Sequence, residues 1–458
     1  MSSDDHAGGV PRTAVLDGHN DLAWAVRKHF GGDLGRLDLA AGVPELQTDL
    51  PRLRAGGVGA QFWSVYVPHS LAGPAAVAAV LEQVDLVHRL AERYPDDLEI
   101  ALDAGDVRRI MASGRIASLM GAEGGHAIDS SLGVLRMLQA LGVRYLTLTH
   151  NANVGWADSG TDRPAAGGLT DFGRDVVREM QRIGMLVDLS HTSADTMRDA
   201  LATATEPVIF SHSSAYEVCR HPRNVPDDVL GTLAGNGGVC MVTFVPAFVS
   251  QECADWRQGL VAEVGRRGLD ERNLAETDSI AAEWEAAHPR PRATLSQVAD
   301  HVEHVREVAG IEHVGLGGDY DGTADLPDGL TDVSCYPALF AELRDRGWSD
   351  GDCTALAHAN IVRVLADARV GHVRGPPRRH HRSPADLHPV IGAVGVRSRR
   401  WQRRRRRSGT VAPWRSCRRW YASRRSATVT PRSSTPTPST ACSPSSNASS
   451  RCCTSGWS

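Results

Sequence analysis

The stretch MLVDLSHTSADTMRDALATATEPVIFSHS, residues 185–213, contains one structural unit and the start of the next. An apolar run at 185–189 is followed by His191. Residues 193–202 then have the three- and four-residue apolar spacing of an amphipathic helix. A second apolar run follows and ends in His212. The stretch therefore predicts a strand, a polar loop, a helix and a second strand, with a histidine after each strand.

The same unit recurs through the first 370 residues. Eight apolar or β-branched runs occupy residues 14–16, 58–67, 116–121, 145–149, 185–189, 207–211, 238–244 and 314–318. Helical spacing lies between them at 75–94, 132–141, 171–183, 193–202 and 295–309. Strands alternating with helices predict an α/β fold, a closed (β/α)8 TIM barrel. The alternative, an open doubly wound sheet, more often has a glycine-rich phosphate loop after its first strand, and the sequence has none there.

Two segments depart from this pattern. Residues 250–293 form a long polar insertion before the eighth strand, with a helix predicted at about 280–287, over or beside the site. Residues 371–458 are rich in Arg, Ser and Pro and have no apolar periodicity, which predicts a disordered basic tail. We therefore predict a barrel domain over 1–370 and a tail over 371–458.

The formal net charge of -4 is an average over these two parts. The tail has 19 Arg against one acid, Asp386, and the rest of the chain has 31 basic against 53 acidic residues. An acidic barrel repels polyanions, so nucleic acid would bind only non-specifically through the tail. The chain has 49 Arg and one Lys, Lys28, which indicates a GC-rich gene and favours a frameshift as the origin of the tail; a genuine basic tail is the alternative.

The first residues lack the basic start and apolar run of an export signal, and no apolar stretch reaches the roughly 18 residues of a membrane span. We expect a cytoplasmic protein with no membrane partner. The five cysteines of the first 370 residues have no CxxC spacing, which argues against a disulfide framework and a thiolate metal site.

Histidines and carboxylates follow six of the eight predicted strands. These strand ends read DGHND (17–21), EGGH (123–126), THN (149–151), DLSH (188–191), SHS (211–213) and GDYD (318–321). A barrel of this kind assembles its active site at the carboxyl ends of its strands. His19 and Asp21 share one face of a strand, so both can reach one ion. Such ligands suit Zn²⁺ or Mn²⁺, and more than four candidates suggest two ions. Five further histidines are predicted to lie on helix or loop surfaces, with no role in the site: His221, His301, His304, His313 and His358.

The chain resembles the membrane dipeptidase family, also called renal dipeptidases, over about residues 14–367. The resemblance rests on several ordered stretches, among them DGHNDL (17–22), DLPRLRAGGVGAQFWSVYVP (49–68), YLTLTHNANVGW (145–156), RNVPDDV (223–229) and GLGGDYDG (315–322). It implies a binuclear zinc dipeptidase on an amidohydrolase-like barrel, acting on dipeptides, and favours a homodimer.

The resemblance also implies a ligand set. His19 and Asp21 resemble the ligands of one zinc ion, His191 and His212 those of the other, and Glu123 the carboxylate that bridges the two. A hydroxide held between the ions would then attack the peptide carbonyl. Other divalent ions are possible in the same site.

Three further residues resemble catalytic and substrate-binding groups of the family. His150 corresponds to the donor that contacts the carbonyl oxygen, and Asp319 to the group that carries a proton from water to the leaving amine. Arg223 corresponds to the residue that binds the free carboxylate of the substrate.

Several alternatives stay open. Arg223 could instead form a surface ion pair with Asp227 or Asp228. Asp321 could support Asp319 or cap the next helix, and His126 could hydrogen bond to a metal ligand. The chain could also be another metal-dependent amide or lactone hydrolase of this barrel group, or a nucleic-acid-binding protein acting through its tail.

Overall fold

The computed structural model describes residues 6–7, 10–11, 14–270 and 274–368, so the tail predicted at 371–458 lies outside the described residues. Eight parallel strands form a closed ring in chain order, and the pairing of β4 with β6 completes it. The ring strands are β3 (Val15–Asn20), β4 (Val58–Ser64), β6 (Ile116–Glu123), β7 (Val143–Thr147), β8 (Leu186–Asp188), β9 (Ile209–Phe210), β10 (Val239–Val242) and β11 (Val314–Leu316). All eight predicted strands are present, and the (β/α)8 barrel is confirmed.

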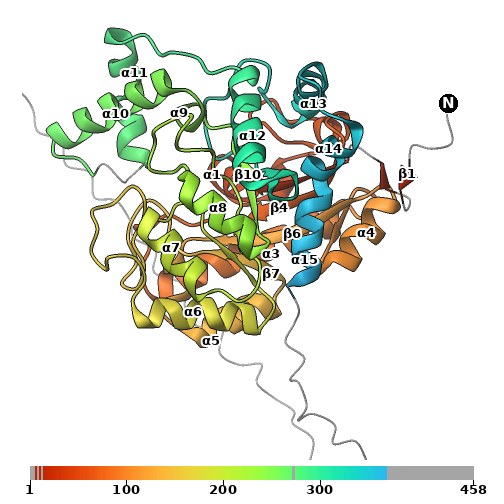
Figure 1. Cartoon of the computed structure of the whole chain (residues 1–458), viewed down its shortest axis with the longest axis horizontal. Coiled ribbons are helices and arrows are strands. Elements are labelled where there is room, and N and C mark those ends of the chain that lie inside the picture. Colours follow the sequence, from red (N-terminus) through yellow and green to blue (C-terminus); the bar gives the residue numbers. More distant parts are fainter. Residues whose placement is uncertain (1–5, 8–9, 12–13, 271–273, 369–458) are drawn as a thin grey trace, which may run out of the picture. The chain divides into compact units, whose positions relative to one another are not determined.

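Helices follow the ring strands and surround them (Figure 1). They are α1 (Leu22–Phe30), α2 (Leu50–Ala55), α3 (Pro74–Arg93), α4 (Ala104–Ala112), α5 (Leu132–Ala140), α6 (Asp171–Arg182), α7 (Ala194–Thr203), α8 (Asp227–Asn236), α9 (Pro246–Val249), α10 (Gln251–Arg266), α11 (Leu274–Ala287), α12 (Leu295–Ala309), α13 (Tyr336–Asp345), α14 (Asp350–Thr354) and α15 (Asn360–Asp367). The five predicted helices match α3, α5, α6, α7 and α12 to within one residue at each end. No described helix is both long and apolar enough to cross a membrane.

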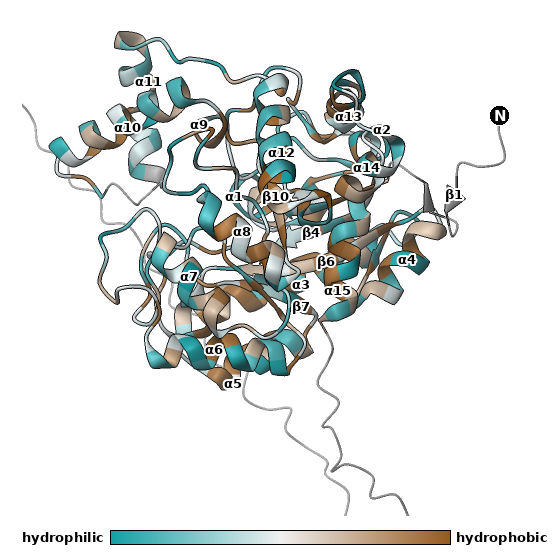
Figure 2. Ribbon diagram, in the orientation of Figure 1, coloured by the Kyte–Doolittle hydropathy of each residue, from teal (hydrophilic) through white to brown (hydrophobic). Residues whose placement is uncertain are grey.

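Side-chain alternation along the strands divides the core into two layers. In β3, Leu16 points into the ring, where Phe62, Leu119 and Met241 also pack, whereas Val15 packs outward against the helices. Figure 2 shows the hydrophobic colours concentrated on the strands and the inner faces of the helices. Apolar side chains of α4 and α15 join the inner layer, so these two helices pack against the barrel interior.

The insertion at 250–293 contains two helices rather than one. Helix α11 includes the predicted segment, but α10 was not predicted because charged and polar residues interrupt its apolar positions. Leu260 and Val264 of α10 pack against Ile280 of α11 in a small cluster separate from the two core layers. Three short strands were also missed: β5 (Leu98–Ile100) pairs with the start of β6, and β1 (His6–Ala7) pairs with β2 (Val10–Pro11).

The surface position predicted for His301 is wrong, because this side chain of α12 is fully buried. Its Nδ1 accepts a hydrogen bond from the Ala215 backbone N–H at 3.1 Å, and its Nε2 donates to the Val249 carbonyl at 3.0 Å. The ring therefore joins α12 to the segment after β9 and to the end of α9. Burial lowers the pKa of His301 to about 4.

This burial predicts a pH-dependent contribution to stability. The folded pKa of His301 lies below the unfolded value of about 6.5, so the unfolded chain binds the proton first as pH falls. The contribution is complete above about pH 6.5 and is lost progressively toward pH 4. In urea unfolding, the stability advantage of the wild type over His301→Gln should shrink by about 2 kcal/mol between pH 7.5 and pH 5. An advantage that stays constant over that range would contradict the assignment.

Candidate metal centre

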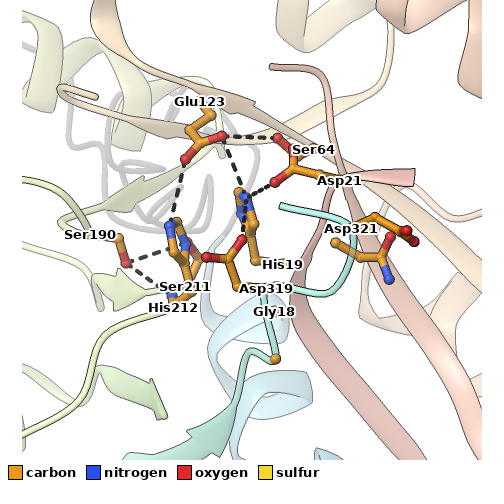
Figure 3. Close-up of polar contacts among 12 residues, drawn as sticks. Gly18, His19, Asp21, Ser64, Glu123, Ser190, Ser211, His212, Asp319 and Asp321 are labelled. Carbon is orange, nitrogen blue, oxygen red and sulfur yellow. Dashed lines mark hydrogen bonds and ion pairs between the residues drawn. The ribbon is translucent and has the colours of Figure 1, made fainter. Parts of the chain in front are cut away.

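The strand ends bring the five predicted ligands together. His19 lies in β3, Asp21 follows it, and Glu123 is the last residue of β6. His191 and His212 follow β8 and β9, and all five side chains are buried. Figure 3 shows four of them, His19, Asp21, Glu123 and His212, close to one another. Together with His150 and Asp319, these residues form three overlapping groups that could hold a cation: His19, Glu123 and His212; Glu123, His150 and His191; and His19, Asp21 and Asp319.

The two carboxylate oxygens of Glu123 face different histidines. Its Oε2 lies 3.5 Å from Nε2 of His19 and accepts a hydrogen bond from the Ser64 hydroxyl at 3.2 Å. Its Oε1 lies 2.9 Å from Nε2 of His191 and 3.6 Å from Nε2 of His212. The carboxylate thus stands between two sets of imidazoles, which is the arrangement expected of a bridging ligand.

Several observations fit a bound cation. Nε2 of His19 and Oδ1 of Asp21 are buried with no hydrogen-bond partner among the described residues. Nε2 of His191 lies 3.0 Å from Nε2 of His212, and two lone pairs at that distance repel unless a proton or a cation lies between them. Ligands of a tetrahedral zinc ion lie about 3.3 Å apart, similar to these distances. Burial also lowers the pKa of both rings well below the usual value, which keeps them neutral as metal ligands must be.

The opposite side of His19 is held by Tyr145. Nδ1 of His19 lies 2.8 Å from the Tyr145 hydroxyl, which donates to the Gly18 carbonyl at 3.3 Å. His19 Nδ1–H therefore donates to Tyr145, and Nε2 is left as the free acceptor. The ring of Tyr145 crosses β6 at Gly121, where an added Cβ would come within 1.9 Å of it. Burial opposes a charge on His19, but Tyr145 and the nearby carboxylates raise its pKa well above the usual value. A proton or a metal cation is thus needed to balance the carboxylates.

Asp319 enters the centre from the end of β11. Its backbone φ is +60°, in the left-handed region, and its Oδ1 lies 3.9 Å from Nε2 of His19. Burial raises the pKa of this carboxyl well above its usual value. Gly322 makes the approach possible, since a Cβ there would lie 2.3 Å from both Oδ1 of Asp319 and Oδ2 of Asp21.

Asp321 supports Asp319 only indirectly, through the loop that carries both, and it caps none of the described helices. Its Oδ1 accepts from the Gln47 backbone N–H at 2.8 Å, and its own N–H donates to Oε1 of Gln47 at 2.6 Å. This pair ties the loop after β11 to the loop before α2. Asp321 therefore shapes the loop that carries Asp319 without touching the metal ligands through these bonds.

His150 lies beside the centre, with Nε2 3.8 Å from Oε1 of Glu123. Its ring packs against those of Tyr66 and His191, with centroids 4.9 and 4.5 Å away, and burial lowers its pKa well below the usual value. His126, by contrast, bonds through Nε2 to the Val67 carbonyl at 3.0 Å rather than to a ligand. A neutral His150 can supply one N–H donor.

Arg223 is buried, with only 1% of its surface exposed, so a surface ion pair is excluded. Nη1 donates to the Ser213 hydroxyl and Nη2 to the His212 carbonyl, each at 3.4 Å, and the guanidinium lies 5.0 Å from the ring centroid of Phe248. Burial lowers the pKa of Arg223 to about 10, so it stays charged at neutral pH.

The two acids considered as surface partners of Arg223 are occupied elsewhere. Asp228 pairs with Arg198 at 2.8 Å, and Asp227 pairs with His304 at 2.7 Å. Among the described residues no carboxylate forms an ion pair with Arg223, which leaves the guanidinium available to an anionic ligand.

Two buried aspartates beneath the ligands were not predicted. Asp17 accepts hydrogen bonds from the backbone of His19 and Gly318 and from the side chains of Gln61 and Tyr336. Asp188 accepts from the backbone N–H groups of Ser190 and Ser211 and from the hydroxyls of Thr147 and Ser211. The sequence signal that could have identified these two aspartates is an acid two or three residues before a histidine, in a strand that is otherwise apolar.

Solved structures with the same architecture include dipeptidases. The probable dipeptidase PvdM from Pseudomonas aeruginosa is 22% identical, with a TM-score of 0.68 over 78% of this chain and 96% of its own. A metallopeptidase from Rhodobacter sphaeroides, bound to a phosphinate mimic of the dipeptide L-Ala-D-Ala, is 23% identical, with a TM-score of 0.64 over 78% of this chain and 99% of its own. At these identities the likeness establishes the fold.

The family follows from the sequence match. The model of the membrane dipeptidase family, peptidase family M19, matches residues 10–373, which include every candidate ligand, His150, Arg223 and Asp319. The match spans most of the chain and the whole barrel described above. The chain therefore belongs to the membrane dipeptidase family and is a dipeptidase-type metallohydrolase.

Proposed function

We propose that the enzyme hydrolyses the peptide bond of dipeptides and that its centre holds two divalent ions, Zn²⁺ in the first instance. His19 and Asp21 would hold one ion and His191 and His212 the other. The observation that carries the proposal is the position of Glu123, whose two oxygens face these two sets separately.

Bound at such a site, two ions lower the pKa of a water molecule and polarise the peptide carbonyl. The chain supplies the remaining groups. Asp319 accepts a proton from the attacking water at a carboxylate oxygen and delivers it to the leaving nitrogen as the C–N bond breaks. His150 donates from Nε2 to the carbonyl oxygen as it gains negative charge. The products are two free amino acids.

Arg223 supports a dipeptide as the substrate. It is a buried cation with no described carboxylate partner, and its Nη2 contacts the carbonyl of His212, so it lies against the centre. A guanidinium binds a carboxylate in a bidentate pair, and the C-terminal carboxylate of a dipeptide lies one residue from the scissile bond. The phosphinate ligand of the Rhodobacter sphaeroides structure mimics a dipeptide, which favours the same substrate class here. The homodimer and the cytoplasmic location stay predictions.

The direct test is hydrolysis of a panel of dipeptides with and without a chelator, by the wild type and by Asp319→Asn. A lactone that carries an N-acylamino group serves as the rival substrate. Dipeptides should be cleaved, chelator should abolish cleavage, and the variant should lose about 10²–10⁴-fold in kcat because it lacks the proton carrier. Dipeptide hydrolysis that survives both treatments, or turnover of the lactone alone, contradicts the proposal.

Arg223 is tested by changing both partners of the expected pair. The wild type should prefer a dipeptide to its C-terminal amide by about 10²-fold or more in kcat/KM. Arg223→Lys should lose most of that preference, because an ammonium cannot form the bidentate pair, while its activity on the amide should change little. Equal loss on acid and amide would indicate a structural role instead.

Gly322→Ala tests the close approach of Asp21 and Asp319. The added methyl group must displace one or both carboxylates, and a shift of about 1 Å can cost about 10²-fold in rate. The matched control is Gly231→Ala in α8, where an added Cβ meets no atom within 4 Å and helix propensity favours alanine. Steady-state kinetics should separate the two variants, and similar rates would contradict the predicted clash.

A further inference from the structure

The four histidines of the centre differ in what holds their Nδ1 atoms. Among the described residues, Nδ1 of His150 and of His191 have no partner, and Nδ1 of His19 meets the Tyr145 hydroxyl. Only Nδ1 of His212 is connected to a carboxylate. It lies 2.8 Å from the Ser211 hydroxyl, which donates to Oδ2 of Asp188 at 2.7 Å.

The direction of these bonds fixes the position of a proton. Oδ1 of Asp188 accepts from two backbone N–H groups and Oδ2 accepts from the Ser211 hydroxyl, so the single Ser211 hydroxyl proton points toward Asp188. The other possible acceptor, the Ser190 hydroxyl, lies farther away at 3.4 Å. The Ser211 oxygen then has a lone pair for His212, so the imidazole proton lies on Nδ1. Nε2 is left with its lone pair toward Glu123 and His191.

Asp188 also fixes the backbone ahead of both histidines. Its Oδ1 accepts from the N–H groups of Ser190 at 3.1 Å and Ser211 at 2.8 Å, the residues that precede His191 and His212. His191 has a φ of +67°, a conformation that a non-glycine residue keeps only where neighbours hold it. One buried carboxylate thus anchors both segments that carry the histidines of this half of the centre.

We infer that Asp188 is a positioning residue which, through the Ser211 hydroxyl, holds the His212 proton on Nδ1 and presents Nε2 as a metal ligand. The inference rests on the proposed two-ion centre. It assigns Asp188 to the ion held by His191 and His212 and not to the ion held by His19 and Asp21. Outer hydrogen bonds of this kind typically change metal affinity by about 10–100-fold.

The test compares Ser211→Ala and Asp188→Asn with the control Thr147→Val. The control removes another hydrogen bond to Oδ2 of Asp188, 2.5 Å long, without breaking the connection to His212. Full-length proteins are stripped of metal, and the two Zn²⁺ dissociation constants are measured by competition with a chromogenic chelator. Thermal midpoints of the metal-free proteins report general structural damage.

Ser211→Ala should raise the dissociation constant of one of the two Zn²⁺ ions about 10–100-fold and leave that of the other within about threefold of the wild-type value. Asp188→Asn should do the same or more, since an amide at this position can donate to Ser211 and turn its proton toward His212. Thr147→Val should leave both constants nearly unchanged. Raising free Zn²⁺ should restore much of the kcat of Ser211→Ala, which structural damage would not allow.

The outcomes distinguish this inference from the proposed function. A wild type that binds fewer than two ions contradicts the two-ion centre itself. A wild type that binds two ions with constants that Ser211→Ala leaves unchanged contradicts only the role of Asp188 and Ser211. If Asp188→Asn does not fold, the result for Ser211→Ala is sufficient by itself. The inference is also overturned if Ser211→Ala and Thr147→Val raise both Zn²⁺ dissociation constants to the same extent.

Discussion

The contact on which the rest of the centre depends is the approach of the buried Glu123 carboxylate to imidazole nitrogens on both of its sides. Burial is costly for an isolated carboxylate, and the pKa of Glu123 is raised accordingly. His191 and His212 are kept neutral by the same burial, so they cannot balance the charge themselves. The proposed cation on each side would resolve this conflict, and it would also account for two buried ring nitrogens that lie 3.0 Å apart.

The barrel makes this arrangement possible because its strands all end at one rim. Below the rim, the inward positions are apolar, and at the rim they change to acids and histidines. Asp188 lies at this change, whereas Asp17 shares the outward face of β3 with Val15 and accepts a hydrogen bond from Tyr336 of α13. Each carboxylate binds the backbone of its own strand end and that of a neighbouring strand, Gly318 for Asp17 and Ser211 for Asp188. These hydrogen bonds hold the strand ends together without involving a metal ion, which is the preorganisation that a metal site needs.

Most of the fold could be predicted because it depends on short-range patterns. The assignment of the five metal ligands rests on the resemblance to the family and stays a prediction, although the structure brings these residues together. Apolar runs separated by segments of helical spacing predicted all eight ring strands. The position of a histidine at the end of a strand determines which rim of the barrel it reaches. What could not be predicted depends on contacts between distant residues. Asp321 bonds to Gln47, far away in the chain, and the buried environment of Arg223 and His301 is made by other segments. Helix α10 was missed because its narrow apolar side becomes recognisable only against α11.

Two ions should lie on opposite sides of Glu123, and anomalous X-ray scattering at the zinc edge from crystals of the metal-loaded enzyme can locate them. Two peaks should appear, one nearest His19 and Asp21 and one nearest His191 and His212, with one oxygen of Glu123 beside each. A single peak shared by His19 and His212, or no peak at Glu123, would contradict the two-ion centre.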